Sequence, residues 1–340
     1  MLLLALLAAS LQFHDPGLLH HLAWPSAAMT VACVAALGVS RVSAHRRAVS
    51  EARDLRDDTL ADELKNAVEN GDLELHYQPQ VDARGSVVAL EALLRWERKD
   101  GRRVPPDVFI SVAEDAGLMR RITGTVLDSA IAQVAAWHRQ ELPVQVSVNI
   151  CPADALMPGF SRSVLGLLGR HGVPHESLKI EVTESTETHD LRSVAEALTE
   201  LRIRGVTISL DDFGTGHSSI SRLRLLPVDE LKIDRSFVSR MATDPQDAAV
   251  VRCSVELARA LGLTVLAEGV ETAETQELLE GMGVALFQGW LFSAALPPDE
   301  VTAWIRSRDV ASCAMTCLPR EAPAEEAVPP PGQADSLTVP

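Results

Sequence analysis

Eight short runs rich in β-branched residues alternate with amphipathic stretches between Leu73 and Arg308, and this alternation predicts an α/β fold. Eight strands with intervening helices over roughly 240 residues match the size of a (β/α)8 barrel. Polar side chains gather at the ends of the runs, which is where barrel enzymes build their sites. The predicted architecture is therefore a barrel preceded by an N-terminal transmembrane segment and a linker helix. A doubly wound open sheet is the alternative that the pattern alone leaves open.

Residues 1–43 are expected to anchor the chain in a membrane through one or two transmembrane segments. The uncharged run from Leu22 to Ser40 approaches the length that crosses a hydrocarbon core. Arginines follow at once from Arg41, which by the positive-inside rule places the rest of the chain in the cytoplasm. The shorter run from Met1 to Phe13 is either a second span or part of a cleaved secretory signal. A buried soluble hairpin is the remaining alternative.

Three further regions follow the anchor. Residues 44–70 mix acidic and basic side chains with regularly spaced apolar ones, and they predict a solvated linker helix. Residues 71–310 are expected to form the barrel. Residues 311–340 are rich in Pro and Ala and predict a disordered tail.

The strands of the barrel are predicted from short runs whose interiors are expected to be apolar. They cover residues 73–81, 87–96, 144–150, 178–184, 206–212, 230–234, 264–269 and 285–289. Helical spacing separates most of them, for example at residues 126–139, 193–204 and 248–261. No Gly-x-Gly-x-x-Gly follows any strand, which argues against dinucleotide binding.

Acids, amides and one lysine stand at the carboxyl ends of these strands: Glu91, Asn149, Glu181, Asp211, Asp212, Lys232, Asp234, Glu268 and Gln288. Strand ends converge on one face of a barrel, and converging carboxylates repel one another unless cations lie among them. Oxygen ligands without His or Cys favour Mg²⁺ or Mn²⁺. Two such ions suit in-line attack of water on a phosphodiester, with Lys232 orienting the water and Arg95 holding a phosphate oxygen.

Net charge and cysteine content narrow the function further. The formal net charge is −16, which argues against binding duplex nucleic acid through a basic surface. Five cysteines in 340 residues do not make a disulfide scaffold. A small anionic substrate held through metal ions stays compatible with this charge.

The sequence resembles the EAL-domain family of cyclic di-GMP phosphodiesterases over about residues 70–308. The triplet Glu91-Ala92-Leu93 gives the family its name, and eight further blocks stand in family order. The blocks read YQPQVD (77–82), EALLRW (91–96), FISVAEDAGL (109–118), SVNI (147–150), EVTES (181–185), DDFGTGHSS (211–219), LPVDELKIDRSFV (226–238), AEGVET (267–272) and QGWLF (288–292). The resemblance implies a TIM-like barrel that hydrolyses cyclic di-GMP to linear pGpG with two Mg²⁺ or Mn²⁺ ions.

The resemblance also implies a role for each site residue. One metal is held by the positions of Glu91, Asn149, Glu181 and Asp211. The second is held by those of Asp211, Asp212 and Glu268. Catalytic roles fall on Lys232, which contacts the water, and on Gln288, Glu268 and Glu91. Gln78, Arg95 and Asp234 are expected to contact substrate. Glu184 is expected to brace the loop from Asp212 to Ser219, and Glu271 to lie near the site.

The family further implies a homodimer at the bacterial inner membrane with the catalytic domain in the cytoplasm. The main alternative is a catalytically silent receptor for cyclic di-GMP with the same fold. A barrel lyase that uses Lys232 as its base is a third reading, but that chemistry does not require Asn149 or Arg95. The intact set of acids favours the enzyme.

Overall fold

A computed structural model describes residues 59–183, 190–215 and 219–307. The predicted membrane spans, residues 44–58 of the predicted linker, Glu184 and the predicted tail lie outside these residues. Among the described helices, none is both long and apolar enough to cross a membrane. The chain divides into two compact units. One contains residues 59–70 and 107–116, and the other contains residues 71–106 and 117 onward.

The first unit is helical in its described part. Residues 59–70 form a helix, as predicted for this end of the linker, and Leu64, Ala67 and Val68 on it are buried. Helix α3 (Pro106–Asp115) buries Phe109 and Ala113. The spacing of these apolar residues by three or four positions explains why each helix has one buried face.

The second unit is an eight-stranded barrel, which confirms the predicted barrel. Its strands are β1 (Leu73–Asp82), β2 (Val87–Glu97), β4 (Gln145–Ile150), β5 (Leu178–Thr183), β6 (Thr207–Phe213), β7 (Glu230–Ile233), β8 (Thr264–Ala267) and β9 (Leu286–Phe287). The order is β1-β9-β8-β7-β6-β5-β4-β2, and a β1–β2 pairing closes the ring. The short β3 (Arg103–Val104) extends the edge of β2. Each barrel strand lies within a few residues of its predicted position.

The barrel departs from a regular (β/α)8 pattern at its first strand. β1 runs antiparallel to both β2 and β9, and no helix separates it from β2. A tight turn makes this hairpin: Asp82 Oδ1 accepts hydrogen bonds from the backbone N–H groups of Arg84 and Ser86 at 2.9 and 2.8 Å. Gly85 follows with φ of 78°, a conformation that favours glycine. The remaining barrel strands from β2 to β9 pair in parallel.

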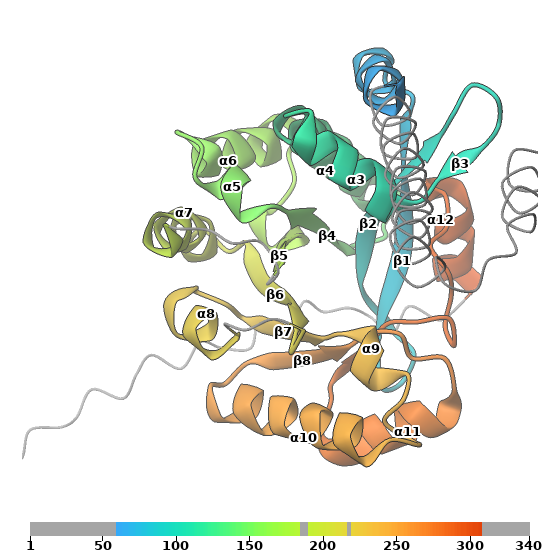
Figure 1. Ribbon diagram of the computed structural model, residues 1–340, viewed down its shortest axis with the longest axis vertical. Coiled ribbons are helices and arrows are strands. Elements are labelled where there is room, and N and C mark those ends of the chain that lie inside the picture. The colour runs from blue at the N-terminus through green and yellow to red at the C-terminus, as the bar shows by residue number, and fades with distance from the viewer. Residues whose placement is uncertain (1–58, 184–189, 216–218, 308–340) are drawn as a thin grey trace, which may run out of the picture. The chain divides into compact units, whose positions relative to one another are not determined.

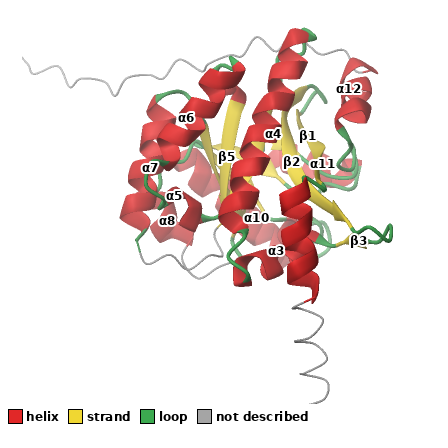
Figure 2. Cartoon of the chain, turned by 90° about the horizontal axis from the view of Figure 1, so that it is seen from above, coloured by secondary structure: helices red, strands yellow, loops and turns green. Residues whose placement is uncertain are grey.

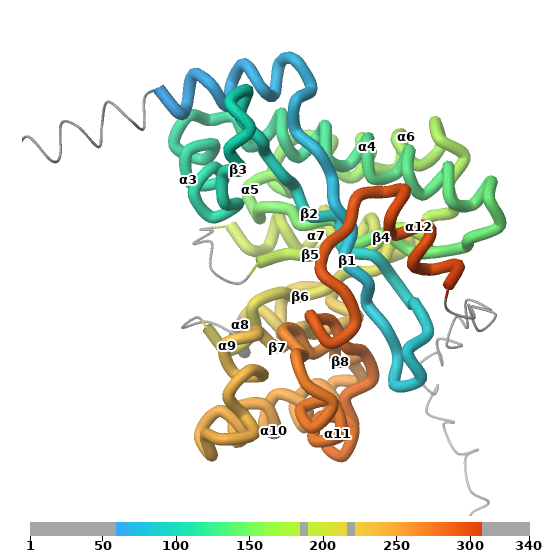
Figure 3. Tube along the Cα trace, turned by 90° about the vertical axis from the view of Figure 1, so that its right-hand side faces the viewer, coloured from blue at the N-terminus to red at the C-terminus, as the bar shows by residue number. Residues whose placement is uncertain are grey.

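Helices cover the outside of the strands (Figures 1 and 2). They are α4 (Met119–Arg139), α5 (Pro152–Ala155), α6 (Phe160–His171), α7 (Leu191–Ile203), α8 (Ser219–Leu225), α9 (Arg235–Val238), α10 (Pro245–Ala260), α11 (Ala273–Met282) and α12 (Pro298–Ser307). A short 3-10 helix, η1 (His175–Ser177), precedes β5. α4 packs on β1, β2 and β4, α10 packs on β7 and β8, and α12 packs on β1. The segment leading to α12 lies beside β1, where Leu296 pairs with Tyr77 (Figure 3).

Polar side chains line the inner face of the barrel, and several of them stand in the middle of strands. The expectation that the middle positions of the strands are apolar is therefore wrong. Side chains alternate along a strand, so Ile180 and Val182 on β5 face the helices while Lys179 and Glu181 face inward. Lys179 is only 1% exposed and Glu181 is fully buried. The buried polar residues of the inner face stack in two layers along the strands, and the upper layer builds the site described next.

Candidate active site

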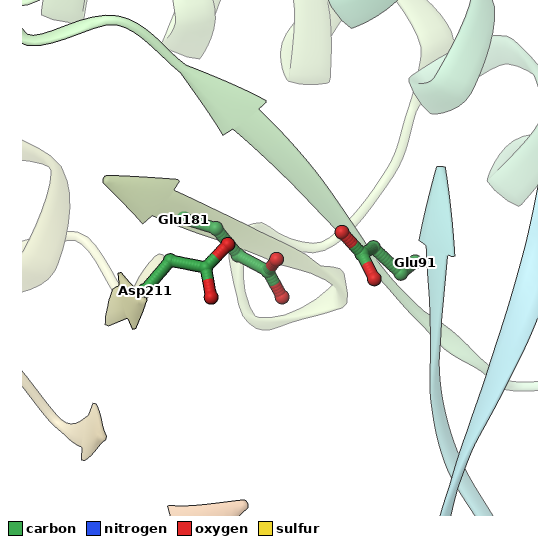
Figure 4. A group of neighbouring side chains, drawn as sticks. All are labelled: Glu91, Glu181 and Asp211. Atoms are coloured by element: carbon green, nitrogen blue, oxygen red, sulfur yellow. The ribbon is translucent and has the colours of Figure 1, made fainter. Parts of the chain in front are cut away.

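Three parallel strands of the barrel, two of them adjacent, carry three buried carboxylates to a common site. Glu91 lies on β2, Glu181 on β5 and Asp211 at the end of β6. Figure 4 shows their carboxyl groups directed into a common space. One oxygen of each lies within 4.8 Å of the others, a spacing that suits a shared cation. The structure brings these three residues together as predicted, but Glu91 lies in the middle of β2 and not at its end.

A second group of carboxylates shares Asp211 with the first. It contains Asp211, Asp212 and Glu268, again with oxygens within 4.8 Å of one another. Asp212 has a φ of 56°, in the left-handed region, where the pairing of β6 with β7 is irregular. Backbone strain of this kind persists where the surroundings enforce it, often at functional sites. The two groups together contain five carboxylates, with four of them around Asp211.

Lys232 supplies the ammonium group at the centre of these acids. Its Nζ lies 2.6 Å from Glu268 Oε1 and 2.7 Å from Glu181 Oε2. It also lies 3.1 Å from Asp211 Oδ1 and 3.8 Å from Glu91 Oε1. The side chain is fully buried, so these charge interactions are weakly screened by solvent. A single ammonium cannot neutralise five carboxylates, and the excess negative charge requires cations or protons.

Burial and crowding shift the protonation of the cluster. Burial raises the pKa of Asp211 to about 7, against the lowering effect of Lys232. Burial likewise raises the pKa of Glu91 and Glu268. Burial also opposes ionisation of Glu181, but Lys232 and Lys179 outweigh it and lower the pKa of that carboxyl. Burial alone would lower the pKa of Lys232, and the surrounding carboxylates raise it instead, so the lysine stays protonated.

Asn149 completes the donor set at the first group of carboxylates. Its Nδ2 donates to Glu91 Oε1 at 2.6 Å, and it pairs with Glu181 in the β4–β5 register. Its Oδ1 is buried and has no hydrogen-bond partner among the described residues. A buried carbonyl oxygen without a partner is costly unless something satisfies it. Carboxylate and amide oxygens are the ligands that Mg²⁺ and Mn²⁺ prefer, so this donor set fits a divalent cation.

A cleft of about 260 Å³ opens beside the cluster. Gln78, Gln288 and the exposed Trp290 line it together with Glu91, Asp211 and Glu268. Gln288 Nε2 donates to Glu91 Oε2 at 2.5 Å and to Gln78 Oε1 at 3.2 Å. The two predicted glutamines therefore join the carboxylate cluster to the cleft.

The remaining predicted residues lie differently. Glu271 lines the cleft and is exposed. Arg95 is not among the residues that line it, and its Nη1 donates to the carbonyl of Leu94 at 2.9 Å. Asp234 caps α9 by accepting from the backbone N–H of Ser236 at 2.9 Å. The substrate contacts expected of Arg95 and Asp234 stay predictions, as does the bracing role of Glu184.

Sequence reasoning missed a set of buried polar residues directly below the cluster. Gln80, Lys179 and Glu230 are at most 4% exposed and point into the barrel. The sequence pattern that could have indicated them is a charged residue two positions before a site residue, as in Lys179–Glu181 and Glu230–Lys232. Alternate positions of a strand face the same side, so this spacing predicts a shared interior.

Gly289 allows the loop after β9 to pack closely against the loop after β8, because it has no side chain. A Cβ at this position would clash with the backbone oxygen and nitrogen of Val270. The backbone there is held by a 3.0 Å hydrogen bond from Val270 N to Gln288 O. We expect Gly289→Ala to lower the free energy of unfolding by about 2–3 kcal/mol, the upper part of the range for overpacking. Urea unfolding monitored by circular dichroism measures the change.

A matched control for Gly289 lies in helix α11. A Cβ at Gly281 would meet no atom within 4 Å, so Gly281→Ala is expected to be neutral or stabilising by up to about 1 kcal/mol. Equal unfolding free energies for the two variants would contradict the close approach at Gly289.

The fold and the site together define a barrel protein with a cluster of acidic side chains whose oxygens are compatible with a divalent cation. The sequence model of the EAL domain matches residues 61–295, and the chain belongs to the EAL domain family. It is 40% identical over 246 residues to the bifunctional diguanylate cyclase/cyclic di-GMP phosphodiesterase MucR of Pseudomonas aeruginosa, a match that covers 72% of this chain and 36% of that protein.

Solved structures of the family share the fold. The PaMucR phosphodiesterase in complex with c-di-GMP superposes with a TM-score of 0.68 at 40% identity, covering 72% of this chain and 99% of that one. The EAL enzyme Bd1971, in its form bound to cAMP and cyclic di-GMP, gives a TM-score of 0.71 at 30% identity, covering 74% and 70%. The chain spans about a third of the length of the curated relatives it matches.

Proposed function

We propose that this protein hydrolyses cyclic di-GMP to linear pGpG by metal-assisted attack of water on one phosphodiester. The observation that carries the proposal is the sharing of Asp211 between two carboxylate groups, because it provides places for two neighbouring cations. Membership of the EAL family and the c-di-GMP bound to the similar PaMucR structure support the choice of substrate.

The chain's residues divide between two cation positions. Glu91, Asn149, Glu181 and Asp211 would hold one Mg²⁺ or Mn²⁺, and Asp211, Asp212 and Glu268 the second. Bound divalent cations supply positive charge that promotes ionisation of water and offsets charge on the phosphodiester. The protein contributes the fixed positions of these oxygens, because most of them lie on strands whose register is set by backbone hydrogen bonds.

Lys232 and Gln288 act on the reacting groups in this proposal. Lys232 stays protonated among the carboxylates, so its Nζ donates hydrogen bonds and orients the attacking water. Gln288 supports this arrangement through its hydrogen bond to Glu91. We assign Gln78, Arg95 and Asp234 to substrate contacts. Gln78 lines the cleft, Arg95 lies near the end of β2 and Asp234 directly follows β7, and these positions support the assignment.

The experiment that tests the proposal incubates the purified full chain with cyclic di-GMP and either Mg²⁺ or Mn²⁺. Chromatography separates the products, and Glu91→Gln provides the matched control. We expect linear pGpG from the wild-type protein and none from the variant. Tight binding without turnover in either metal would identify a silent receptor and overturn the enzyme proposal.

Trp290 is expected to contribute to substrate affinity. Its side chain lines the cleft and is 71% exposed, so a purine base can stack on it. Base stacking on an aromatic ring contributes about 1–3 kcal/mol. We expect Trp290→Ala to raise KM about tenfold or more with little change in kcat, and Trp290→Phe to stay near wild type. Initial rates at varied substrate concentration measure both constants, and an unchanged KM for Trp290→Ala would contradict the stacking role.

We also propose that residues 1–43 tether the protein to the bacterial inner membrane, with the barrel in the cytoplasm as a homodimer. The uncharged run before Arg41 supports the tether. We expect the full chain to sediment with membranes and to be released by detergent but not by high salt. Release by salt alone would contradict a spanning segment.

A further inference from the structure

A second layer of polar residues lies inside the barrel, one pleat below the carboxylates. Lys179 precedes Glu181 by two positions on β5, and Glu230 precedes Lys232 by two on β7. Alternate residues of a strand face the same side, so both pairs point into the barrel. Lys179 is 1% and Glu230 4% exposed, and neither lines the cleft.

Lys179 and Glu230 form a buried ion pair. Lys179 Nζ lies 2.8 Å from Glu230 Oε1 and 2.7 Å from Oε2. Ser209 Oγ also donates to Glu230 Oε1 at 2.9 Å. The pair neutralises itself, and Lys179 still has a donor left, which it directs to Gln80 Oε1 at 3.0 Å.

This contact fixes the direction of the Gln80 amide. An ammonium group can only donate, so the oxygen of Gln80 must face Lys179 and its nitrogen must face away. The fully buried Gln80 Nε2 lies 3.2 Å from Glu181 Oε1 and 3.0 Å from Gln288 Oε1. Gln80 therefore links the ion pair to a carboxylate of the cluster and to a glutamine of the cleft.

The same logic extends one step further to Gln288. Because its Oε1 accepts from Gln80, its Nε2 must face the cleft side, where it donates to Glu91 Oε2 and Gln78 Oε1. A continuous directed chain of hydrogen bonds thus runs from Lys179 through Gln80 and Gln288 to Glu91. Reversing the Gln80 amide would set its oxygen against the oxygens of Glu181 and Gln288.

We propose that Gln80 and Lys179 are positioning residues that orient Glu181 and Gln288 for cation binding and hydrolysis. They are buried and do not touch the cleft, so they act through the residues that do. This inference rests on the proposed function, because it assigns Glu181 to a cation and Gln288 to the reaction. Partners behind metal ligands typically change metal affinity or activity by about 10–100-fold when they are removed.

The test compares three variants of the full chain with wild type. Gln80→Leu removes the amide at similar volume, and the double variant Lys179→Met/Glu230→Leu removes the ion pair without leaving a charge unpaired. Thr123→Val is the matched control, because it removes a buried 2.8 Å hydrogen bond to Asp154 outside the barrel interior. Calorimetric titration with Mn²⁺ alone gives metal affinity, thermal unfolding gives Tm, and initial rates give kcat and KM.

We expect Gln80→Leu and the double variant to fold, with Mn²⁺ affinity and kcat each lowered about 10–100-fold and KM changed by less than about threefold. Thr123→Val should lower Tm by several degrees and leave Mn²⁺ affinity and kcat unchanged. If Gln80→Leu does not fold, the double variant decides by the same criteria.

Wild-type Mn²⁺ affinity and kcat in the folded variants would show that the lower layer only stabilises the barrel, which overturns the inference and leaves the proposed function intact. A wild-type protein that neither binds Mn²⁺ nor turns over cyclic di-GMP would overturn both. A wild-type protein that binds Mn²⁺ without turnover would overturn the hydrolysis, while loss of Mn²⁺ affinity in the variants would still support positioning of the cation ligands.

Discussion

Asp211→Asn is expected to abolish hydrolysis while the protein stays folded. Asp211 is the one residue common to both carboxylate groups, so the substitution removes charge from both cation positions. Removing a partner behind a metal ligand costs up to about 100-fold, and we expect loss of this shared ligand to lower kcat/KM by more than that. Initial rates of pGpG formation at saturating Mn²⁺ measure the loss.

We expect the free energy of unfolding of Asp211→Asn to stay close to that of the wild-type protein, although its activity is lost. Burial raises the pKa of Asp211 to about 7, so the folded state already disfavours its charged form at neutral pH. Asn has nearly the same shape, and Lys232 keeps its contacts with Glu181 and Glu268. The matched control is Asp128→Asn on α4. The Asp128 carboxylate contacts His171 at 2.8 Å and belongs to neither carboxylate group of the site. Wild-type activity in Asp211→Asn would contradict its place at the centre of the site.

Lys232→Met is expected to give the largest loss of stability. The substitution leaves buried carboxylates without their ammonium partner, and breaking a buried pair in this way costs about 3–5 kcal/mol. Urea unfolding of the metal-free protein at neutral pH measures the change. The control Lys99→Met removes an exposed lysine from the turn after β2 and should be nearly neutral.

The loss in Lys232→Met should depend on pH in a defined direction. Burial raises the pKa of Asp211 to about 7 and raises that of Glu268, and Lys232 is what opposes the shift in both. Without the lysine, the carboxyl groups of Asp211 and Glu268 hold their protons more tightly in the folded state than in the unfolded state. The free energy of unfolding therefore falls as pH rises through the folded-state pKa of these groups. We therefore expect the variant to be more stable at pH 6 than at pH 8, and Mn²⁺ to restore part of the loss. A larger deficit at pH 6 than at pH 8 would contradict the account.

Much of the site could be predicted because strand ends in a barrel converge. Glu91, Glu181 and Asp211 each lie on a predicted strand of the barrel, and parallel strands bring such positions to one face. The alternation of runs also predicted the barrel strands. The antiparallel first strand was missed although residues 82–86 carry a turn signal, because the residues do not show whether a short turn closes a hairpin or leads into a helix.

The lower layer could not be predicted because its contacts are long-range. Lys179 and Glu230 are 51 positions apart, and Gln80 is 99 positions from Lys179. Each looks like an isolated polar residue in a strand, which ordinarily indicates an exposed face. Only the closed barrel shows that they meet. The hydrogen bonds from Lys179 through Gln80 to Gln288 form only because the closed barrel brings these residues together, and no local sequence pattern indicates them.

The most direct test of the central claim is cleavage of cyclic di-GMP in ¹⁸O-labelled water with the full chain and Mn²⁺, followed by mass spectrometry. Attack of water on phosphorus places one ¹⁸O in the phosphate of linear pGpG, and this is the result we expect, with no product from Asp211→Asn. A product without label would show cleavage by a group of the substrate itself, as in a lyase-type reaction with Lys232 as base. Bound but uncleaved cyclic di-GMP would show a receptor, and either result would contradict hydrolysis at this site.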